Sequence, residues 1–287
     1  MDAPHPQIVG VFDSGVGGLS VLPALRRSLP AARLVYVADS GHAPYGERDD
    51  AWLVNRCHLI ARFLRAQGAH MMVMACNTAT AAAAHSLRSH YPHWPIVGIE
   101  PGIKPAVQHS ALGRVGVMAT SATLRSTRFE RLLAEHGQGA QVVAQACTGL
   151  AMAIEQGDEP QIERLVMQHT QAMRDAGVDS VVMGCTHYPF ARPWIERAMG
   201  PGVNLVDTAD AVARRAAQVA LPMSTDGHLA PDESPDDPAD DAARNPAPCE
   251  FWTSGDPAAL EAFARRWLAW TVTAEPLPDL QAQQPGC

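Results

Sequence analysis

Residues 70–81, HMMVMACNTATA, decide the fold of this chain, because an apolar run ends there at a cysteine followed by small polar residues. The apolar residues 71–75 predict a short buried strand, and the alanine-rich run after them predicts a helix with Asn77 or Thr78 as its N-cap. Cys76 therefore lies where a strand meets a helix, at the sheet edge where open α/β folds bind ligands. Because the positive end of a helix lowers the pKa of a thiol, we expect Cys76 to be reactive.

A second stretch, residues 179–190, DSVVMGCTHYPF, repeats the same order of apolar strand, small residue, cysteine and polar pair. The Val-Gly-Val of residues 9–11 also recurs, at residues 115–117, with nearly the same offset as that between Cys76 and Cys185. Two nearly equal offsets in such different segments predict a duplicated pair of α/β halves.

Composition and charge narrow the class of protein. A chain of 287 residues with 47% hydrophobic and 18% charged residues suits a soluble enzyme of two modest domains. No apolar run approaches the length of a membrane span, and residues 1–6 do not resemble a signal peptide, so we expect a cytoplasmic protein without a membrane partner. Six widely spaced cysteines without a CxxC pair argue against a metal site and against a disulfide framework.

Most of the net charge of -8 lies in residues 226–248, which hold seven acids and one arginine. The rest of the chain is nearly neutral and has no basic patch with interleaved aromatic residues, so we expect no nucleic-acid partner. The acidic, proline-rich stretch at residues 225–248 cannot bury enough apolar surface to order itself, and it predicts a mobile loop.

Strands and helices alternate along the chain, which predicts an α/β fold with two pseudo-symmetric domains, mainly parallel sheets and an active site in the cleft between them. We expect strands at residues 7–12, 33–38, 71–75, 95–99, 114–119, 141–146, 179–184, 203–206 and 250–253. We expect helices at residues 19–29, 49–67, 149–156, 161–176, 208–220 and 257–270, besides the helix that begins near Asn77. The last strand and helix have no counterpart in the second half, so we assign residues 1–98 and 207–287 to the first domain and residues 99–206 to the second. The tail after Thr273 is expected to fray.

Two polar loops follow the first two expected strands and so belong to the same sheet edge. Asp13-Ser-Gly-Val-Gly-Gly loosely resembles a nucleotide-binding turn, but the absence of the GxGxxG spacing and of the Walker lysine disfavours a nucleotide. Asp13 itself is either a helix cap or, as we prefer, a catalytic side chain. Pro44-Tyr45-Gly46 either places an aromatic hydroxyl and open backbone near this edge or is an ordinary loop.

The repeat suggests a chemistry. Two halves related by a pseudo-twofold axis would place Cys76 and Cys185 on opposite sides of one cleft, where one thiol removes a proton from a carbon and the other delivers a proton to its opposite face. This exchange inverts a stereocentre. Because the α-proton of an amino acid is far less acidic than a thiol, the site must also stabilise charge on the substrate carboxylate. The candidate donors are Ser14, Asn77, Thr78, Thr120 and Thr186.

Four motifs together resemble the glutamate racemases of the cofactor-independent aspartate/glutamate racemase superfamily. They are DSGVGGLS from Asp13, PYG from Pro44, ACNTA from Ala75 and GCTHYP from Gly184, in the family's order. The resemblance implies an isomerase that interconverts L- and D-glutamate with two thiols and no pyridoxal cofactor. It also implies that the product D-glutamate supplies peptidoglycan synthesis, and hence cell wall biogenesis and cell shape.

The same resemblance implies roles for single residues. Cys76 is the expected base toward D-glutamate and Cys185 the expected base toward L-glutamate, and Asp13 and His187, each near one thiol, are expected to assist them. The expected substrate-binding residues are Ser14, Pro44, Tyr45, Gly46, Asn77, Thr78 and Thr186. Secondary candidates are Thr120 and Thr123, in a turn that fits the family only loosely, and Glu155, a lone acid at a helix end that is either solvated or faces the cleft.

Several alternatives stay open. An aspartate racemase is the nearest rival, although Cys185-Thr-His favours glutamate because the aspartate enzymes resemble Cys-Thr-Glu there. A single-thiol isomerase or decarboxylase is disfavoured because both thiols are present. In a non-catalytic, two-lobed amino-acid-binding protein the cysteines would be incidental. Family members are often dimers, so a homodimer is one alternative, but no patch in the sequence decides the oligomeric state. Without an N-terminal extension we expect no regulation by a cell-wall precursor.

Overall fold

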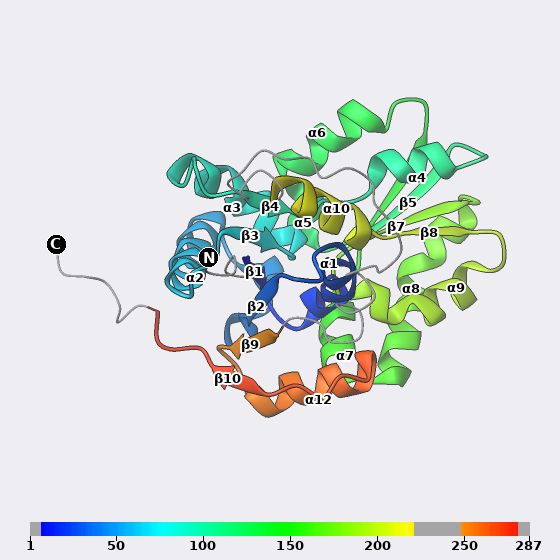
Figure 1. Cartoon of the computed structure of the whole chain (residues 1–287). Coiled ribbons are helices and arrows are strands. Elements are labelled where there is room, and N and C mark those ends of the chain that lie inside the picture. The colour runs from blue at the N-terminus through cyan, green and yellow to red at the C-terminus, as the bar shows by residue number, and fades with distance from the viewer. Residues whose placement is uncertain (1–6, 221–247, 281–287) are drawn as a thin grey trace, which may run out of the picture.

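The chain forms two β-sheets flanked by helices (Figure 1). This computed structural model describes residues 7–220 and 248–280. The predicted acidic loop at residues 225–248 therefore lies outside the described residues, except for Pro248. Within the described ranges every strand pair is parallel, which confirms the predicted α/β class.

The two sheets repeat one strand order. In the described part of the chain, the first sheet contains β1 (Ile8–Asp13), β2 (Arg33–Ala38), β3 (Met71–Met74), β4 (Ile96–Gly98), β9 (Cys249–Thr253) and β10 (Ala274–Pro276). The second contains β5 (Arg114–Ala119), β6 (Gln141–Ala146), β7 (Ser180–Gly184) and β8 (Asn204–Val206). The order β2-β1-β3-β4 in the first sheet matches β6-β5-β7-β8 in the second, which confirms the internal repeat. Strands β9 and β10 extend the first sheet beside β2, whereas the domain boundaries stay a prediction.

Helices cover both faces of each sheet. On the first sheet, one face packs against α1 (Leu22–Ser28), α10 (Ala209–Ala220) and α12 (Pro257–Leu268), and the other against α2 (Asp50–Ala66) and α3 (Asn77–His90). On the second sheet, one face packs against α7 (Leu150–Gln156), α8 (Glu159–Asp175) and α9 (Arg192–Met199), and the other against α4 (Ile103–His109) and α6 (Thr127–His136). Short helical segments are η1 (Gly17–Ser20), η2 (Ser40–His42), η3 (Tyr45–Glu47), α5 (Ser121–Arg125) and η4 (Tyr188–Ala191). No helix in the described ranges has the length and apolar character that a membrane span needs.

The repeated Val-Gly-Val has a packing role in each half. A Cβ added to Gly10 would lie 2.9 Å from Leu64 Cδ1 of α2, and a Cβ added to Gly116 would lie 2.7 Å from Met173 Sδ of α8. Only glycine therefore lets these two helices approach the central strands β1 and β5 so closely. The duplication thus preserves the packing of the layers as well as the order of the strands.

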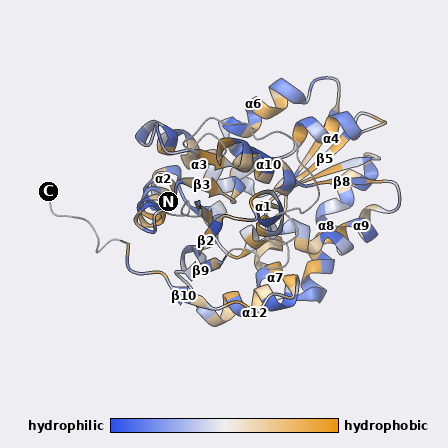
Figure 2. Ribbon diagram, in the orientation of Figure 1, coloured by the Kyte–Doolittle hydropathy of each residue, from blue (hydrophilic) through white to orange (hydrophobic). Residues whose placement is uncertain are grey.

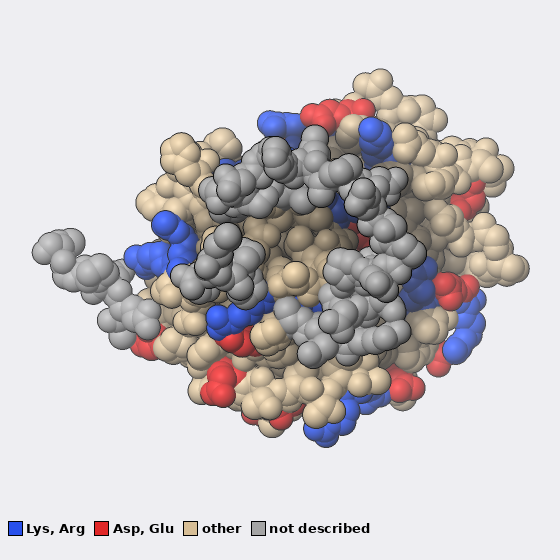
Figure 3. Space-filling view, in the orientation of Figure 1, with Lys and Arg blue, Asp and Glu red and all other residues tan. Residues whose placement is uncertain are grey.

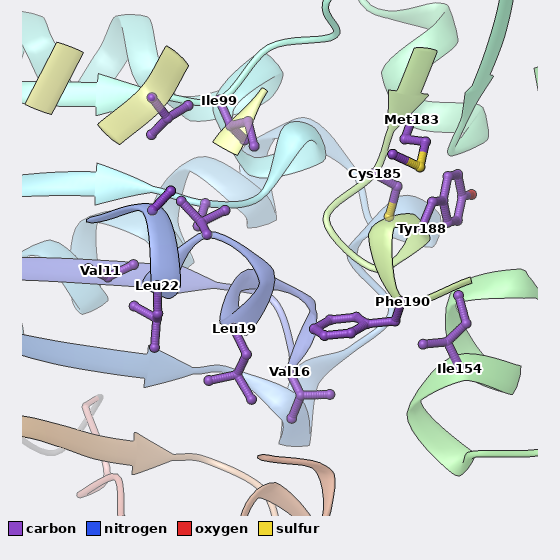
Figure 4. Close-up of a cluster of buried hydrophobic side chains, with 14 of the residues drawn as sticks. Val11, Val16, Leu19, Leu22, Ile99, Ile154, Met183, Cys185, Tyr188 and Phe190 are labelled. Carbon is purple, nitrogen blue, oxygen red and sulfur yellow. The ribbon is translucent and has the colours of Figure 1, made fainter. Parts of the chain in front are cut away.

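One apolar cluster joins the two halves. Val16 and Leu19 of the first half and Ile154 and Phe190 of the second belong to it (Figure 4). Hydrophobic residues concentrate on the strands and on the inward faces of the helices (Figure 2). Because this cluster contains residues of both halves, burial of its apolar surface holds the two sheets in a fixed position relative to each other.

Opposite charges interleave on the surface. Lys and Arg side chains lie beside Asp and Glu side chains around the rim of the face in Figure 3. Exposed ion pairs such as Arg27–Asp210, at 2.8 Å, and Arg266–Glu159, at 2.7 Å, are of this kind. Because exposed pairs contribute only about 0–1 kcal/mol each, the apolar core carries most of the stability of the fold.

Two expectations about these elements are wrong. The single helix expected at residues 19–29 is split into η1 and α1, because Pro23 has no N–H to donate and occupies the first turn of a new helix. The tail does not fray at residues 274–276, because these pair in parallel with β9 as strand β10. The Ala274 N–H also donates to the Glu261 carboxylate at 3.0 Å, which holds the start of that strand.

Candidate active site

The carboxyl ends of equivalent strands from the two sheets face one pocket. Cys76 follows β3 and Cys185 follows β7, and both residues line the pocket, which encloses about 490 Å³ including its opening. Its lining residues are Ser14, Ala43, Pro44, Tyr45, Gly46, Cys76, Asn77, Thr78, Thr120, Ala151, Met152, Glu155, Cys185, Thr186 and His187. The structure therefore brings the two repeated cysteines to the same space.

Cys76 caps the helix that it precedes. Its Sγ accepts a hydrogen bond from the backbone N–H of Ala79 at 3.5 Å, so Cys76 is the N-cap of α3. The prediction that Asn77 or Thr78 caps this helix is wrong, because both already belong to its first turn. The thiol is consequently fixed at the positive end of a helix.

The surroundings of the Cys76 thiol favour its protonated form. Burial and the neighbouring Asp13 carboxylate raise its pKa well above the ordinary value, and hydrogen bonds with Ser14 and Ala79 only partly oppose this. The Sγ donates to the Ser14 Oγ at 3.3 Å. The expectation that the helix end makes this thiol acidic is therefore wrong, because desolvation outweighs the helix end.

Asp13, the last residue of β1, is fully buried and lies behind the pocket wall. Its Oδ1 accepts the Ser14 N–H at 2.7 Å, and its Oδ2 accepts the Gly18 N–H and the Thr186 hydroxyl, the latter at 3.2 Å. Burial raises the pKa of Asp13, although the charge of His187 and the two backbone hydrogen bonds oppose the rise. A carboxyl group with a raised pKa beside a thiol can hold a proton, which is compatible with the predicted assisting role of Asp13.

Cys185 has an imidazole beside it instead of a carboxyl group. Its Sγ lies 3.5 Å from His187 Nδ1, and His187 Nε2 lies 2.7 Å from Glu155 Oε1. Burial alone would lower the pKa of His187, but the hydrogen bonds with Cys185 and Glu155 raise it well above the ordinary value. Burial alone would raise the pKa of Glu155, but His187 and the Val16 N–H lower it. The two side chains therefore form an imidazolium–carboxylate pair next to Cys185.

The glycine-rich turn after β1 receives this ion pair. A Cβ on Gly15 would overlap Glu155 Oε1, and a Cβ on Gly17 would overlap His187 Nδ1. Between them, the Val16 N–H donates to Glu155 Oε1 at 3.4 Å. The glycines thus admit two side chains from the second half, which explains a pattern that only loosely resembled a nucleotide-binding turn.

Three threonine hydroxyls connect the halves at the pocket. Thr78 Oγ1, on α3, lies 3.0 Å from Thr120 Oγ1 and 3.4 Å from Thr123 Oγ1. Thr120 also caps α5, because its Oγ1 accepts the Thr123 N–H at 3.1 Å. Thr78 and Thr120 line the pocket, whereas Thr123 is buried behind them.

The Pro44-Tyr45-Gly46 segment forms a further wall of the pocket. The Tyr45 hydroxyl does not point freely into the pocket, because it donates to the buried carboxylate of Asp39 at 2.6 Å. Gly46 lies against the second half, where a Cβ added to it would be 3.5 Å from the Cβ of Thr120. This segment therefore offers the pocket its ring and backbone, with the hydroxyl already engaged.

The structure brings most of the predicted site residues to the pocket, and only Asp13 and Thr123 among them do not line it. Sequence reasoning missed Ala43, Ala151 and Met152, which do. Met152 lies one helical turn before Glu155 on α7, so the helical period would have placed both on one face. The roles of all these residues stay predictions.

Comparisons with known proteins agree on one family. The Asp/Glu/Hydantoin racemase family model matches residues 12–216. A glutamate racemase of Pseudomonas putida (strain W619) is 46% identical over 257 residues, which cover 88% of this chain and 91% of that protein. The crystal structure of glutamate racemase isoform RacE1 from Bacillus anthracis has a TM-score of 0.81 at 27% identity and covers 97% of this chain and 99% of that chain. Escherichia coli glutamate racemase, in complex with L-glutamate and the activator UDP-MurNAc-Ala, has a TM-score of 0.76 at 29% identity and covers 95% and 98%. The chain therefore belongs to the Asp/Glu/Hydantoin racemase family.

Proposed function

We propose that the chain is a glutamate racemase, which interconverts L- and D-glutamate by moving a proton at the α-carbon between two thiols. The observation that carries the proposal is that Cys76 and Cys185, at the ends of equivalent strands of two sheets, line one pocket. Matched strand ends from two halves supply one acid–base group for each face of a carbon. Relatives named glutamate racemase, 46% and 48% identical to this chain, support glutamate as the substrate.

Neutral donors would hold the substrate carboxylates. Among the described residues that line the pocket, none is lysine or arginine, so the positive charge of this lining comes from His187. The candidate donors are the Thr78 hydroxyl, the Asn77 amide and the backbone at residues 45–46, whereas the hydroxyls of Ser14 and Thr186 already donate to Asp13. Fixed donors of this kind stabilise the charge that develops on the α-carboxylate when the proton leaves.

Conversion of L-glutamate begins at Cys185. Cys185, whose Sγ lies 3.5 Å from His187 Nδ1, takes the α-proton while the electron pair of the C–H bond passes into the carboxylate. Cys76, which burial and Asp13 keep protonated, then donates its proton to the opposite face of the carbon. D-glutamate results, Cys185 is left as a thiol and Cys76 as a thiolate.

The reverse direction needs Cys185 as a thiol and Cys76 as a thiolate, so the His187 imidazolium supplies a proton to Cys185 and Cys76 gives up its own proton. Ser14 Oγ lies 3.3 Å from Cys76 Sγ and 3.3 Å from Asp13 Oδ1, so it bridges the thiol and the buried carboxylate. We assign Asp13 as the acceptor of this proton, with Ser14 as the relay between the two groups. Its raised pKa suits a group that takes up and returns a proton during turnover.

In the cell, the D-glutamate formed would supply peptidoglycan synthesis in the cytoplasm, and the enzyme would act as a homodimer without a pyridoxal cofactor. The peptidoglycan role and the cytoplasmic location follow from the activity of the family. Gel filtration of the purified protein tests whether it is a homodimer. Independence from pyridoxal predicts that a pyridoxal scavenger leaves racemisation unchanged.

Proton NMR in D₂O tests the activity directly. The purified protein is mixed with L-glutamate, and separately with L-aspartate, and the α-proton signal and the optical rotation are followed together. We expect both to decay for glutamate and neither for aspartate. Decay for aspartate alone would point to an aspartate racemase, and no decay with either substrate would favour a non-catalytic amino-acid-binding protein.

A further inference from the structure

A buried carboxylate lies behind the Pro44-Tyr45-Gly46 wall of the pocket. Asp39, which directly follows β2, is fully buried. Arg56 donates to it twice, from Nε to Oδ2 at 2.8 Å and from Nη2 to Oδ1 at 2.6 Å. The Tyr45 hydroxyl donates to Oδ2 at 2.6 Å, and the Ser254 hydroxyl donates to Oδ1 at 2.7 Å. We call these four residues the Asp39 network.

The Asp39 network connects four separate segments around the first sheet. Arg56 lies on α2, Tyr45 opens η3 beside the pocket, and Ser254 follows β9. Ser254 Oγ also accepts the Gly41 N–H at 3.1 Å, which attaches the loop before Pro44 to the same point. Since β9 has no counterpart in the second sheet, a strand added outside the repeat reaches the wall of the active site.

The network is held by charge as well as by geometry. Burial raises the pKa of Asp39, but the hydrogen bonds and charge of Arg56, together with the hydroxyls of Tyr45 and Ser254, lower it below the ordinary value. The carboxylate is therefore ionised and accepts all of these donors at once. Bidentate pairs of this kind fix both partners in orientation.

We propose that Arg56 and Ser254 are positioning residues for the substrate, because by fixing Asp39 they hold Tyr45 and thereby set the pocket wall at residues 44–46. The proposal rests on the proposed glutamate racemase activity and adds that the Tyr45 hydroxyl acts through Asp39 and does not contact glutamate itself. Arg56 and Ser254 do not line the pocket, so any effect they have on substrate binding must pass through the network.

Steady-state kinetics with D-glutamate test this on Ser254→Ala and Tyr45→Phe. Loss of one hydrogen bond to the carboxylate should loosen the wall and raise KM roughly three- to tenfold, with kcat within about twofold of wild type. Ser40→Ala is the matched control, because the Ser40 hydroxyl belongs to the same loop, is buried and has no hydrogen-bond partner among the described residues. Its KM should equal that of wild type.

The double variant separates the two ways in which Tyr45 can act. If both hydroxyls act through Asp39, Ser254→Ala combined with Tyr45→Phe raises KM by less than the product of the single effects. An effect equal to that product would mean that Tyr45 binds glutamate independently, and this would overturn the proposal. A lowered melting temperature with unchanged KM in Ser254→Ala would also overturn it, because the network would then only stabilise the fold. Arg56→Lys, which keeps the charge but loses the bidentate pair, should raise KM in the same way.

Hydrogen–deuterium exchange gives a measurement that does not depend on activity. We expect faster amide exchange in residues 43–48 of Ser254→Ala than in the same residues of Ser40→Ala and of wild type. Equal exchange in all three proteins would refute the positioning role. A wild-type protein that does not racemise glutamate would instead refute the proposed function, while the exchange data would still decide whether the network holds the wall.

Discussion

The two thiols occupy equivalent strand ends, yet different groups surround them. Cys76 has a carboxyl group as its partner, because Asp13 lies close by and Ser14 bridges the two. Cys185 has an imidazole as its partner, and that imidazole is paired with Glu155. Duplication of the fold thus supplies matched geometry, whereas the groups beside the two thiols differ.

The different surroundings of Cys76 and Cys185 cannot be inferred from the kcat/KM values of the two directions. L- and D-glutamate are mirror images, so their equilibrium constant is unity and kcat/KM stays equal for both directions in every variant. A defect confined to one side appears instead as α-proton exchange that is not accompanied by inversion. Deuterium incorporation into unreacted L- or D-glutamate therefore tells the Cys76 side from the Cys185 side.

The largest effect is expected from removing either thiol. Cys76→Ser and Cys185→Ser should each lower racemisation by at least about 10³-fold, because a serine hydroxyl is a far weaker acid–base group at this position. Cys76→Ser should still incorporate deuterium into L-glutamate, and Cys185→Ser into D-glutamate, as measured by NMR in D₂O. Substantial racemisation by both variants would exclude the two-thiol mechanism.

Gly17→Ala tests how closely the two halves must meet. The new Cβ would overlap His187 Nδ1 and displace the imidazole from Cys185, so we expect roughly a 10²-fold loss of kcat/KM. The defect should lie on the Cys185 side, with deuterium exchange retained in D-glutamate and lost in L-glutamate. Circular dichroism checks that the variant is folded. Equal loss of exchange from both enantiomers would contradict the assignment of His187 to Cys185.

Ser14→Ala tests the Cys76 side of the pocket. It removes the hydroxyl between Cys76 and Asp13, and we expect about a tenfold loss of kcat/KM, in line with the loss of a hydrogen bond to a charged group. Exchange into D-glutamate should fall more than exchange into L-glutamate, the opposite of the result for Gly17→Ala. Ser20→Ala is the control, because the Ser20 hydroxyl lies on the same turn but donates to the Thr186 carbonyl at 2.9 Å. If Ser20→Ala gave the same exchange pattern, the relay would have no support.

Strands and site residues that depend on local sequence pattern could be predicted from the sequence. The repeated apolar runs located β3 and β7, and a cysteine at the end of each located the pocket, because parallel strands present their carboxyl ends at one edge. Helices α4 and α6 were not predicted, although Phe129, Leu132 and Leu133 of α6 follow the helical period.

Contacts between distant segments could not be predicted in this way. The docking of Glu155 and His187 onto the glycine turn depends on the packing of one half against the other. The pKa of Cys76 was misjudged for the same reason, because local sequence reveals the helix end but not the burial and the nearby carboxylate that outweigh it.

The smallest effect is expected from the Glu155–His187 pair, and it depends on pH. Glu155 favours the charged form of His187, so Glu155→Gln should lower the pKa of His187 and move the alkaline limb of the kcat/KM profile to lower pH. At neutral pH and below, the loss of activity should be small. Glu159→Gln, which removes an exposed carboxylate paired with Arg266, is the control and should leave the profile unchanged.

The pH dependence of the stability of Glu155→Gln should follow from the pKa shifts of His187 and Glu155. The raised pKa of His187 contributes stability that is complete below the ordinary histidine pKa and is lost as pH rises through the raised value. The lowered pKa of Glu155 contributes stability that is present above the ordinary glutamate pKa and is lost as pH falls through the lowered value. Wild type should therefore exceed Glu155→Gln in melting temperature most between these two limits, with the difference shrinking on both sides. A difference that did not change with pH would mean that the pair is not ionised, and the contrast between a carboxyl partner for Cys76 and an imidazolium partner for Cys185 would then fail.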